Sequence, residues 1–283
     1  MGTSSSKAKN KKLSSNKDIK DSEVVQYKTP AIISTPTGEK KDRSFYVQSN
    51  KSNETITRSN GDLAGNPFNA SNLINCTVII EDFCDSINID KCDECTFILS
   101  AVRGSIFVRS CKRSQFMMVC GQFRCFDCNE CGFWLHSKTG PVIESSKKIR
   151  IGCSRIGYDK LIENMVNAHL DPYINKWTDV HDFTPAKGNF EIDDKTPTDF
   201  YTQEKPVLPF TVSSQLSKKY FNVKLKKSQL DSAILLSNSN HIFVKINILA
   251  NTDEIICCVG CQSQTNVQKI FQKLEPISIQ KKK

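Results

Sequence analysis

The chain has 283 residues and a formal net charge of +9, with 39 Lys and Arg residues against 30 Asp and Glu residues. This length predicts one main domain, one small domain and a tail, each domain being able to bury its own core. We expect neither a cleaved signal segment nor a membrane-spanning helix, so the 13 cysteines are expected to stay reduced in the cytosol.

Residues 1–40 are predicted to form a disordered tail, because they are rich in Ser, Lys, Asn and Thr and lack apolar periodicity. Residues 1–6 match the pattern for N-myristoylation, with Gly2 as the acylated residue. A single acyl chain binds membranes weakly, and nearby lysines would supply a second, electrostatic signal: Lys7, Lys9, Lys11 and Lys12. The alternative is a solvated tail that carries no lipid.

Between residues 73 and 153 an alternation of apolar and polar residues returns at intervals of about 18 residues. Each repeat starts with a small or apolar side chain, and the starting residues are Cys76, Cys95, Ser114, Cys131 and Ile149. A period of two within a longer period indicates short strands in stacked coils, with alternate side chains pointing into a shared interior. We therefore predict a parallel β-helix, with corners formed by Asp, Asn and Ser residues and by Gly104, Gly121 and Gly132.

The repeats and their flanks are assigned to one domain over residues 41–192. Within it, apolar spacing predicts a helix over residues 158–169 that would cap the open end of the stack, and residues 177–185 are expected to form an ordered loop. Residues 193–206 have little apolar content and are predicted to be a linker. The order of strands and helices expected over residues 207–283 is typical of a small α+β domain with a ferredoxin-like arrangement.

Two Cys-x-x-Cys pairs, Cys92 with Cys95 and Cys128 with Cys131, are spaced like two halves of a zinc site. A free cysteine also packs as a small hydrophobic residue, and a set of zinc ligands would not include a serine. The repeat register favours a structural ladder without metal, because two coil positions hold small side chains: Cys92, Cys111 and Cys128 at one, and Cys76, Cys95, Ser114 and Cys131 at the other.

We do not expect the chain to have an active site of its own. The sequence shows no evident nucleophile with a base, no Gly-rich phosphate loop and no pair of carboxylates, the motifs that such a site would need. Nucleic-acid binding would need basic residues interleaved with exposed aromatic residues across one face, and the repeats do not have that pattern. Function is therefore expected on a surface that binds another protein.

One outward pair of residues stands out on the predicted coils. In the strand around Cys125 that side chain should point inward, whereas Gln122 and Arg124 should point outward. Ile143 aligns with Cys125 on the next coil, so Glu144 should lie diagonally from Arg124, within reach of its guanidinium. From the register alone, the pair is either a functional feature or an ordinary solvated surface pair.

Five segments carry a family resemblance: GSIFVRSC at residues 104–111, QFR at 122–124, DC at 127–128, PVIESS at 141–146 and WTDVHDFTP at 177–185. Together they resemble the tubulin-folding cofactor C family and, within it, its retinal branch. The resemblance implies a mainly β fold, with a right-handed parallel β-helix and a capping helix. It also implies a GTPase-activating protein for Arf-like small GTPases that move lipidated cargo to cilia.

The same resemblance implies roles for individual residues. Arg124 matches the family's arginine finger, Glu144 matches the carboxylate that positions the finger, and Gln122 is expected to make a supporting contact. Phe183 matches a residue at the GTPase contact, and Phe126, which stands where relatives often have a second arginine, is expected to contact the partner as well.

The chain also departs from the family at several positions. Gly121 replaces a glutamine that often precedes the finger segment, and Thr3 replaces a cysteine that can be palmitoylated in retinal relatives. The small carboxy-terminal domain is far shorter than the nucleoside diphosphate kinase-like domain of those relatives, and Asn238-x-x-His241 lacks the context for kinase activity.

These observations predict a GTPase activator that has no cofactor of its own and acts on GTP and Mg²⁺ held by its partner. The expected partners are an Arf-like small GTPase in its GTP state and an anionic membrane surface, with tubulin as a further candidate and no nucleic acid. The expected location is the cytosolic face of the plasma membrane, near the cilium and basal body. The alternative is a non-catalytic adaptor of the same fold that binds tubulin, actin or a GTPase.

Overall fold

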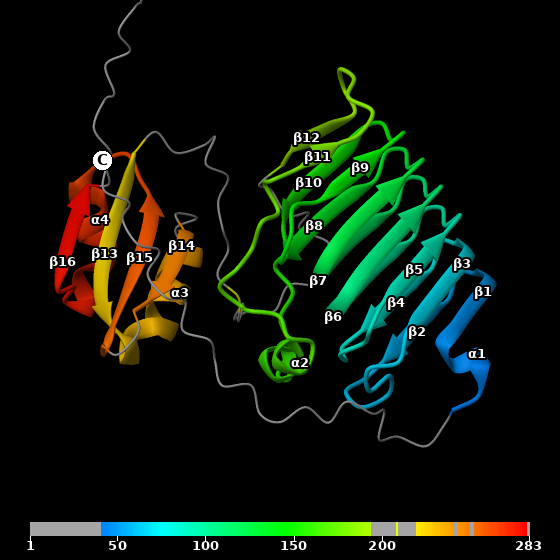
Figure 1. Cartoon of the computed structure of the whole chain (residues 1–283), viewed down its shortest axis with the longest axis horizontal. Coiled ribbons are helices and arrows are strands. Elements are labelled where there is room, and N and C mark those ends of the chain that lie inside the picture. Colours follow the sequence, from blue (N-terminus) through cyan, green and yellow to red (C-terminus); the bar gives the residue numbers. More distant parts are fainter. Residues whose placement is uncertain (1–40, 194–207, 209–218, 240–242, 250–251, 282–283) are drawn as a thin grey trace, which may run out of the picture.

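The computed structural model describes residues 41–193, 208, 219–239, 243–249 and 252–281 (Figure 1). The predicted tail with Gly2 and its lysines, and nearly all of the predicted linker, lie outside the described residues. None of the helices within the described ranges is long and apolar enough to span a membrane.

The amino-terminal domain is a stack of parallel coils, which confirms the predicted β-helix (Figure 1). A short helix, α1 (Arg43–Tyr46), precedes the first coil. The twelve strands are β1 (Val47–Ser52), β2 (Thr55–Arg58), β3 (Phe68–Ile74), β4 (Thr77–Ile80), β5 (Ile87–Asp90), β6 (Thr96–Arg109), β7 (Gln115–Phe126), β8 (Gly132–Ser137), β9 (Val142–Glu144), β10 (Ile149–Cys153), β11 (His181–Asp182) and β12 (Phe190–Ile192).

The strands form two walls. The first wall runs through β1, β3, β5, the second halves of β6 and β7, and then β9 and β11. The second wall runs through β2, β4, the first halves of β6 and β7, and then β8, β10 and β12. All of these pairings are parallel, so each coil repeats the register of the coil before it.

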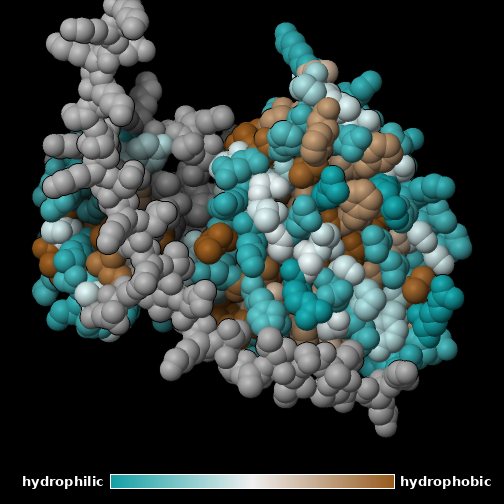
Figure 2. Space-filling model, in the orientation of Figure 1, coloured by the Kyte–Doolittle hydropathy of each residue, from teal (hydrophilic) through white to brown (hydrophobic). Residues whose placement is uncertain are grey.

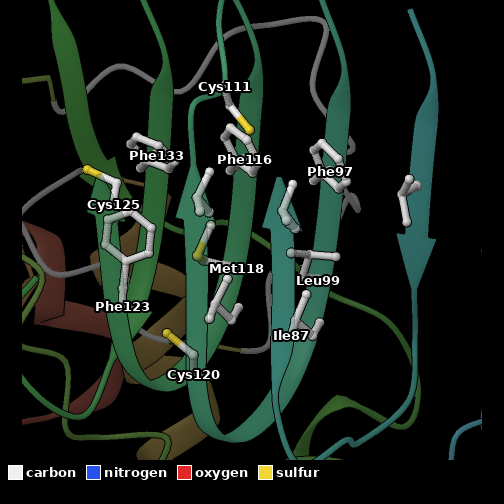
Figure 3. Packing of buried hydrophobic residues seen from close by; sticks show 14 of the residues in the cluster. Ile87, Phe97, Leu99, Cys111, Phe116, Met118, Cys120, Phe123, Cys125 and Phe133 are labelled. Carbon is white, nitrogen blue, oxygen red and sulfur yellow. The ribbon is translucent and has the colours of Figure 1, made fainter. Parts of the chain in front are cut away.

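The register agrees with the spacing of the repeats. Val78 pairs with Phe97, Phe97 with Phe116, and Phe116 with Phe133, so these side chains stack inside the coils. The ring centroids of Phe97 and Phe116 lie 4.9 Å apart, and those of Phe116 and Phe133 lie 4.8 Å apart (Figure 3). A stack of rings at this spacing adds ring–ring attraction to the burial of apolar area and makes the walls stiff.

The helix predicted after the repeats is present as α2 (Leu161–Asn167), but its expected place was wrong. It packs against the outside of the second wall rather than over the end of the stack. The physical reason is that this wall points large apolar side chains outward as well as inward, at Ile98, Met117 and Trp134, and these need cover. Trp177 belongs to the core inside the coils, and Phe45 and Tyr46 of α1 are partly buried against the same core.

Residues 177–185 also differ from the expected loop. Within them β11 pairs with β9, and β12 pairs with β10 a few residues later, so the chain returns to build one more coil after α2. The corners were predicted in part: Asn, Asp and Ser residues do occupy them, but Gly104, Gly121 and Gly132 do not. The corner residues have φ between 45° and 58°, and they are Asn50, Asn53, Asn72, Asn75, Lys91, Glu94, Ser110, Arg113, Asp127, Glu130, Ser145 and Lys148.

Gly104 and Gly121 are required for close approach between coils instead. A Cβ atom on Gly121 would lie 2.4 Å from the carbonyl oxygen of Arg103, and one on Gly104 would lie 2.9 Å from that of Asp85. No side chain fits at these distances. Gly121 therefore allows the coils to approach closely directly before the strand segment that carries Arg124.

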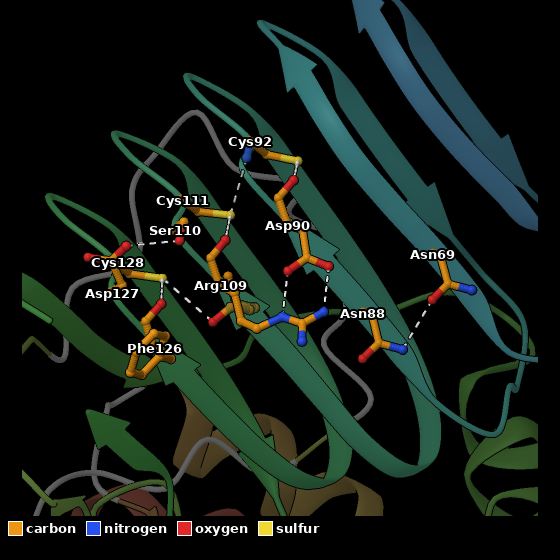
Figure 4. Close-up of polar contacts among 11 residues, drawn as sticks. Asn69, Asn88, Asp90, Cys92, Arg109, Ser110, Cys111, Phe126, Asp127 and Cys128 are labelled. Atoms are coloured by element: carbon orange, nitrogen blue, oxygen red, sulfur yellow. Dashed lines mark hydrogen bonds and ion pairs between the residues drawn. The ribbon is translucent and has the colours of Figure 1, made fainter. Parts of the chain in front are cut away.

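The cysteines occupy the predicted ladder, and those of the coil stack are all buried (Figure 4). The thiol of Cys92 donates to the carbonyl oxygen of Asp90 at 3.4 Å, and the backbone N–H of Cys92 donates to the sulfur of Cys111, one coil later, at 3.4 Å. Ser114 follows the same pattern, because its hydroxyl accepts the N–H of Cys95 at 3.1 Å. Small sulfur or oxygen side chains thus satisfy backbone groups at corners where successive coils pair only through isolated bridges.

The carboxy-terminal domain has the predicted ferredoxin-like order. Its elements are β13 (Tyr220–Lys226), η1 (Lys227–Gln229), α3 (Leu230–Ser239), β14 (Phe243–Ile248), β15 (Glu254–Gly260), α4 (Gln264–Phe271), η2 (Gln272–Leu274) and β16 (Ser278–Lys281). The sheet has the order β14-β15-β13-β16, and each neighbouring pair is antiparallel. Its core is a separate hydrophobic cluster that includes Phe221, Val259 and Phe271.

Candidate functional site

The predicted site residues lie on the outside of the first wall, in two columns that cross successive strands. Arg124 pairs with Phe107 on β6 and with Val142 on β9, and Val142 pairs with His181 on β11. In the second column Phe126 pairs with Arg109 and with Glu144. We call this surface the Arg124 face; its members are Phe107, Arg109, Arg124, Phe126, Val142, Glu144, His181 and Phe183.

Arg124 is exposed at the centre of this face. Its neighbours along the strand, Phe123 and Cys125, are buried in the coil interior, so the backbone that carries the guanidinium is held rigidly. Within the described residues, Arg124 makes no ion pair or side-chain hydrogen bond. Beside it, the side-chain oxygen of Gln122 accepts a hydrogen bond from the Ser105 hydroxyl at 3.1 Å.

Glu144 lies diagonally from Arg124, as the repeat register predicts. Arg124 pairs with Val142, and Glu144 is two residues further along the same strand, on the same outer surface. The structure contains no ion pair between Arg124 and Glu144 among the described residues. The two charged groups are therefore neighbours on one rigid wall, and the orienting role of Glu144 stays a prediction.

Two phenylalanines border this charged pair. Phe126 is 39% exposed and Phe183 is 54% exposed, and both are large apolar side chains in contact with water. The N–H of Phe183 donates to the Ile143 carbonyl at 2.9 Å, which continues the pairing of β11 with β9 and puts Phe183 beside Glu144. The His181 ring meets the Phe183 ring edge to face, with centroids 4.5 Å apart.

A network of hydrogen bonds fixes the backbone on both sides of Phe183. The Asp182 carboxylate accepts the N–H of Thr184 at 3.0 Å and the side-chain amide of Asn189 at 2.9 Å. The Thr184 hydroxyl accepts the N–H of Ser145 at 2.6 Å, which ties this segment to the strand of Glu144. An exposed aromatic side chain on a fixed backbone loses little conformational entropy when it binds a partner.

Sequence reasoning missed several members of the Arg124 face. Phe107 and Arg109 could have been found, because the inward pair Ile106 and Val108 aligns with the inward pair Phe123 and Cys125, which places Phe107 beside Arg124. His181 could not be found in this way, since residues 154–180 interrupt the repeat before β11. No periodic signal relates the last coil to the earlier ones.

No group of three or more His, Cys, Asp or Glu side chains in the described residues is arranged to hold a metal ion. Burial raises the pKa of the Cys120 thiol to about 12, and burial also raises the pKa of Cys84. Protonated, buried thiols are poor nucleophiles and poor ligands. The lack of bound zinc remains a prediction for elemental analysis of the purified protein.

Residues 65–183 match the family model described as Tubulin binding cofactor C, a segment that contains every member of the Arg124 face. The resemblance to the tubulin-folding cofactor C family is confirmed. The matched segment begins at the corner before β3 and ends at Phe183, directly after β11. It does not include the ferredoxin-like domain.

Individual proteins are also similar to parts of this chain. Protein XRP2 of Mus musculus is 35% identical over 159 residues, which cover 56% of this chain and 46% of that protein. Protein XRP2 of Homo sapiens is 32% identical over 184 residues, covering 64% and 52%. Tubulin-folding cofactor C of Arabidopsis thaliana is 25% identical over 134 residues, covering 47% and 39%. The chain thus spans about half the length of the XRP2 proteins it matches.

Proposed function

We propose that this chain is a GTPase-activating protein for an Arf-like small GTPase and that Arg124 is its arginine finger. The observation that carries the proposal is the position of Arg124. Its guanidinium is exposed, has no ion pair or side-chain hydrogen bond with the described part of the chain, and lies on a stiff wall bordered by two exposed phenylalanines. An ordinary structural arginine on such a wall would pair with a carboxylate on the coil before it, as Arg109 does with Asp90.

Phosphoryl transfer requires positive charge where negative charge develops between the phosphates, and a finger supplied by a second protein can raise the rate by about 10³ to 10⁵. In this proposal the GTP and its Mg²⁺ belong to the GTPase, and Arg124 enters its site. Glu144 limits the directions the guanidinium can take, and Gln122, held by Ser105, supports the contact. Phe126 and Phe183 form the apolar part of the interface.

Membrane attachment is a further part of the proposal. Myristoylation of Gly2 and the lysines after it would together hold the chain at an anionic cytosolic membrane surface, near the cilium, where lipidated cargo is moved. Gly2→Ala should shift the protein from membranes to the cytosol. Equal membrane retention of the variant and the parent in cell fractionation would contradict the lipid anchor.

The experiment that tests the activity is single-turnover GTP hydrolysis by a panel of purified Arf-like GTPases, with and without the purified chain. We expect at least one GTPase to be accelerated by about 10³ or more. Binding of GTPases without acceleration of any of them would overturn the proposal.

A second candidate function rests on the names of other similar proteins. Tubulin-folding cofactor C and Tubulin-specific chaperone C are each similar to part of this chain, so an adaptor that binds tubulin is the competing proposal. Cosedimentation with tubulin, measured for the parent chain and for the Arg124→Ala variant, separates the two proposals. The adaptor proposal expects binding to tubulin and no acceleration of GTP hydrolysis.

A further inference from the structure

Three arginines of the coil stack are each paired with an aspartate about one coil earlier. Arg103 pairs with Asp85, Arg109 pairs with Asp90, and Arg113 pairs with Asp93, each with a shortest distance of 2.5 Å. The three arginine side chains are also similarly exposed, at 46%, 42% and 47%. Exposed pairs of this kind contribute little to stability, so stability alone does not explain them.

Their positions on the walls differ. Arg103 lies at the bend between the two halves of β6, and Arg113 lies in the turn between β6 and β7. Arg109 alone among the three lies within the paired part of the first wall, where it pairs directly with Phe126. It is therefore diagonal to Arg124 on the outer surface, in the same way that Glu144 is diagonal on the other side.

The geometry of Arg109 leaves part of its guanidinium available. Its Nε donates to one oxygen of Asp90 at 2.5 Å, and its Nη2 donates to the other oxygen at 2.6 Å (Figure 4). Its guanidinium carbon also lies 5.0 Å from the centroid of the Phe107 ring. Among the described residues, Nη1 has no hydrogen-bond partner, so two N–H groups remain available on a side chain that is 42% exposed and already held by Asp90.

Arg113 demonstrates that a guanidinium in this stack can hold two carboxylates at once. Its Nη2 is 2.5 Å from Asp93, and its Nε is 3.1 Å from Glu94. Arg109 has one carboxylate from its own chain, and the second position is exposed on the Arg124 face. A bidentate pair on one side orders the side chain in advance, so less conformational entropy is lost when a second carboxylate binds.

We propose that Arg109 is a preorganised anchor for an acidic side chain of the protein partner, next to the site that Arg124 enters. This inference rests on the proposed function and deepens it, because it states the chemistry of the partner's surface: a carboxylate close to the nucleotide, flanked by apolar groups that meet Phe107 and Phe126. Arg109 is a binding residue and not a catalytic one, because Arg124 is the group that reaches the phosphates.

The test compares Arg109→Gln with two matched controls, Arg103→Gln and Arg113→Gln, which remove equally exposed ion pairs away from the Arg124 face. The probe is the GTPase that binds the parent chain most tightly in the panel, loaded with a non-hydrolysable GTP analogue for binding and with GTP for hydrolysis. Thermal unfolding of the three variants shows whether each is folded, and we expect similar midpoints for all three.

We expect Arg109→Gln to raise the dissociation constant and the half-saturating concentration about tenfold, to leave the maximal hydrolysis rate unchanged and to reduce the dependence of binding on salt. The controls should stay near the parent value. Arg109→Lys should recover only part of the affinity, because an ammonium group cannot hold Asp90 in a bidentate manner and also bind a second carboxylate.

An Arg109→Gln variant that binds like the two controls would overturn this inference and leave the proposed function standing. So would a fall in the maximal rate at an unchanged dissociation constant. If the parent binds a GTPase but does not accelerate hydrolysis, the activity is wrong, yet a selective loss of binding in Arg109→Gln still supports the anchor. If no GTPase binds the parent chain, both proposals are wrong.

Discussion

The two walls of the coil stack are built from the same repeat but present opposite kinds of outer surface. The second wall points Ile98, Met117 and Trp134 outward, and each is at most 4% exposed because it shares a buried cluster with α2 and with residues that flank this helix. The first wall leaves Phe126 and Phe183 exposed beside Arg124, which pairs with no carboxylate in the ranges that the structure describes. In the space-filling view, hydrophobic atoms on the visible side of the stack are interspersed with hydrophilic ones (Figure 2).

The difference separates two uses of apolar side chains. Burial under a helix stabilises the fold, because the area removed from water contributes on folding. An uncovered aromatic side chain on a rigid wall gives no such stabilisation, because its apolar area is removed from water only when a partner covers it. Changes on the second wall should therefore act on stability, and changes on the first wall should act on binding and rate.

The largest effect is expected at Arg124. Arg124→Ala should lower the maximal stimulated hydrolysis rate by about 10³ while the dissociation constant changes little, since the finger acts mainly on charge present in the transition state. Arg124→Lys should also fail, because an ammonium group cannot span two phosphate oxygens. Single-turnover hydrolysis and binding are measured on the same preparations. Unchanged hydrolysis with Arg124→Ala would remove the finger from the mechanism.

Trp134→Ala should break the second wall. The side chain is fully buried, so its removal should lower the free energy of unfolding by about 3 to 5 kcal/mol. Phe183→Ala, a loss of an exposed ring, should change it by less than about 0.5 kcal/mol. Urea unfolding of both variants checks the contrast, and binding should show the reverse order. Similar stability losses for the two variants would contradict the separation of the walls.

A buried histidine on the second wall should make stability depend on pH. Burial lowers the pKa of His136 to about 4, and its Nε2 lies 3.3 Å from the Asp171 carbonyl oxygen. The unfolded chain, with an ordinary histidine pKa of about 6.5, binds the proton first as the pH falls. This group should therefore lower the free energy of unfolding by about 2 kcal/mol between about pH 7.5 and about pH 5.

His136→Gln is the variant that isolates this contribution, because glutamine keeps an N–H donor and does not titrate. Urea unfolding of the parent and the variant at the two pH values gives the comparison. The variant should lose less stability than the parent on acidification. Equal losses would mean that His136 is hydrated or charged in the folded chain.

The smallest effect is expected at Glu144. Glu144→Gln should reduce the maximal stimulated rate by about tenfold, less than Arg124→Ala, because a mobile finger still reaches the site part of the time. Glu94→Gln, which removes a corner carboxylate away from the Arg124 face, is the control and should leave the rate unchanged. A loss as large as that of Arg124→Ala would give Glu144 a direct role in the chemistry.

Much of the Arg124 face could be predicted from the sequence, and particular residues show why. Strand alternation is a local property, so the inward direction of Cys125 sets the outward direction of Arg124 without any knowledge of the rest of the fold. The repeat interval then extends this reasoning to the next coil and to Glu144. Alternation on the coil before also predicts Phe107 and Arg109 on this face, because Ile106 and Val108 align with Phe123 and Cys125.

The sequence by itself determined the coil register, the thiol ladder and the ferredoxin-like order, because each follows from periodicity or from the order of elements along the chain. Only the tertiary structure decided that α2 covers the second wall, that β11 resumes the first wall after residues 154–180, and that Arg109 is held by Asp90. The first two contacts join residues that no period relates, so they depend on which surfaces meet when the coils stack. Asp90 and Arg109 are one repeat apart, and the structure adds that their side chains pair. The strands of the second wall carry apolar residues on both faces, which is typical of strands covered on both sides, but only the tertiary structure decides which segment covers them.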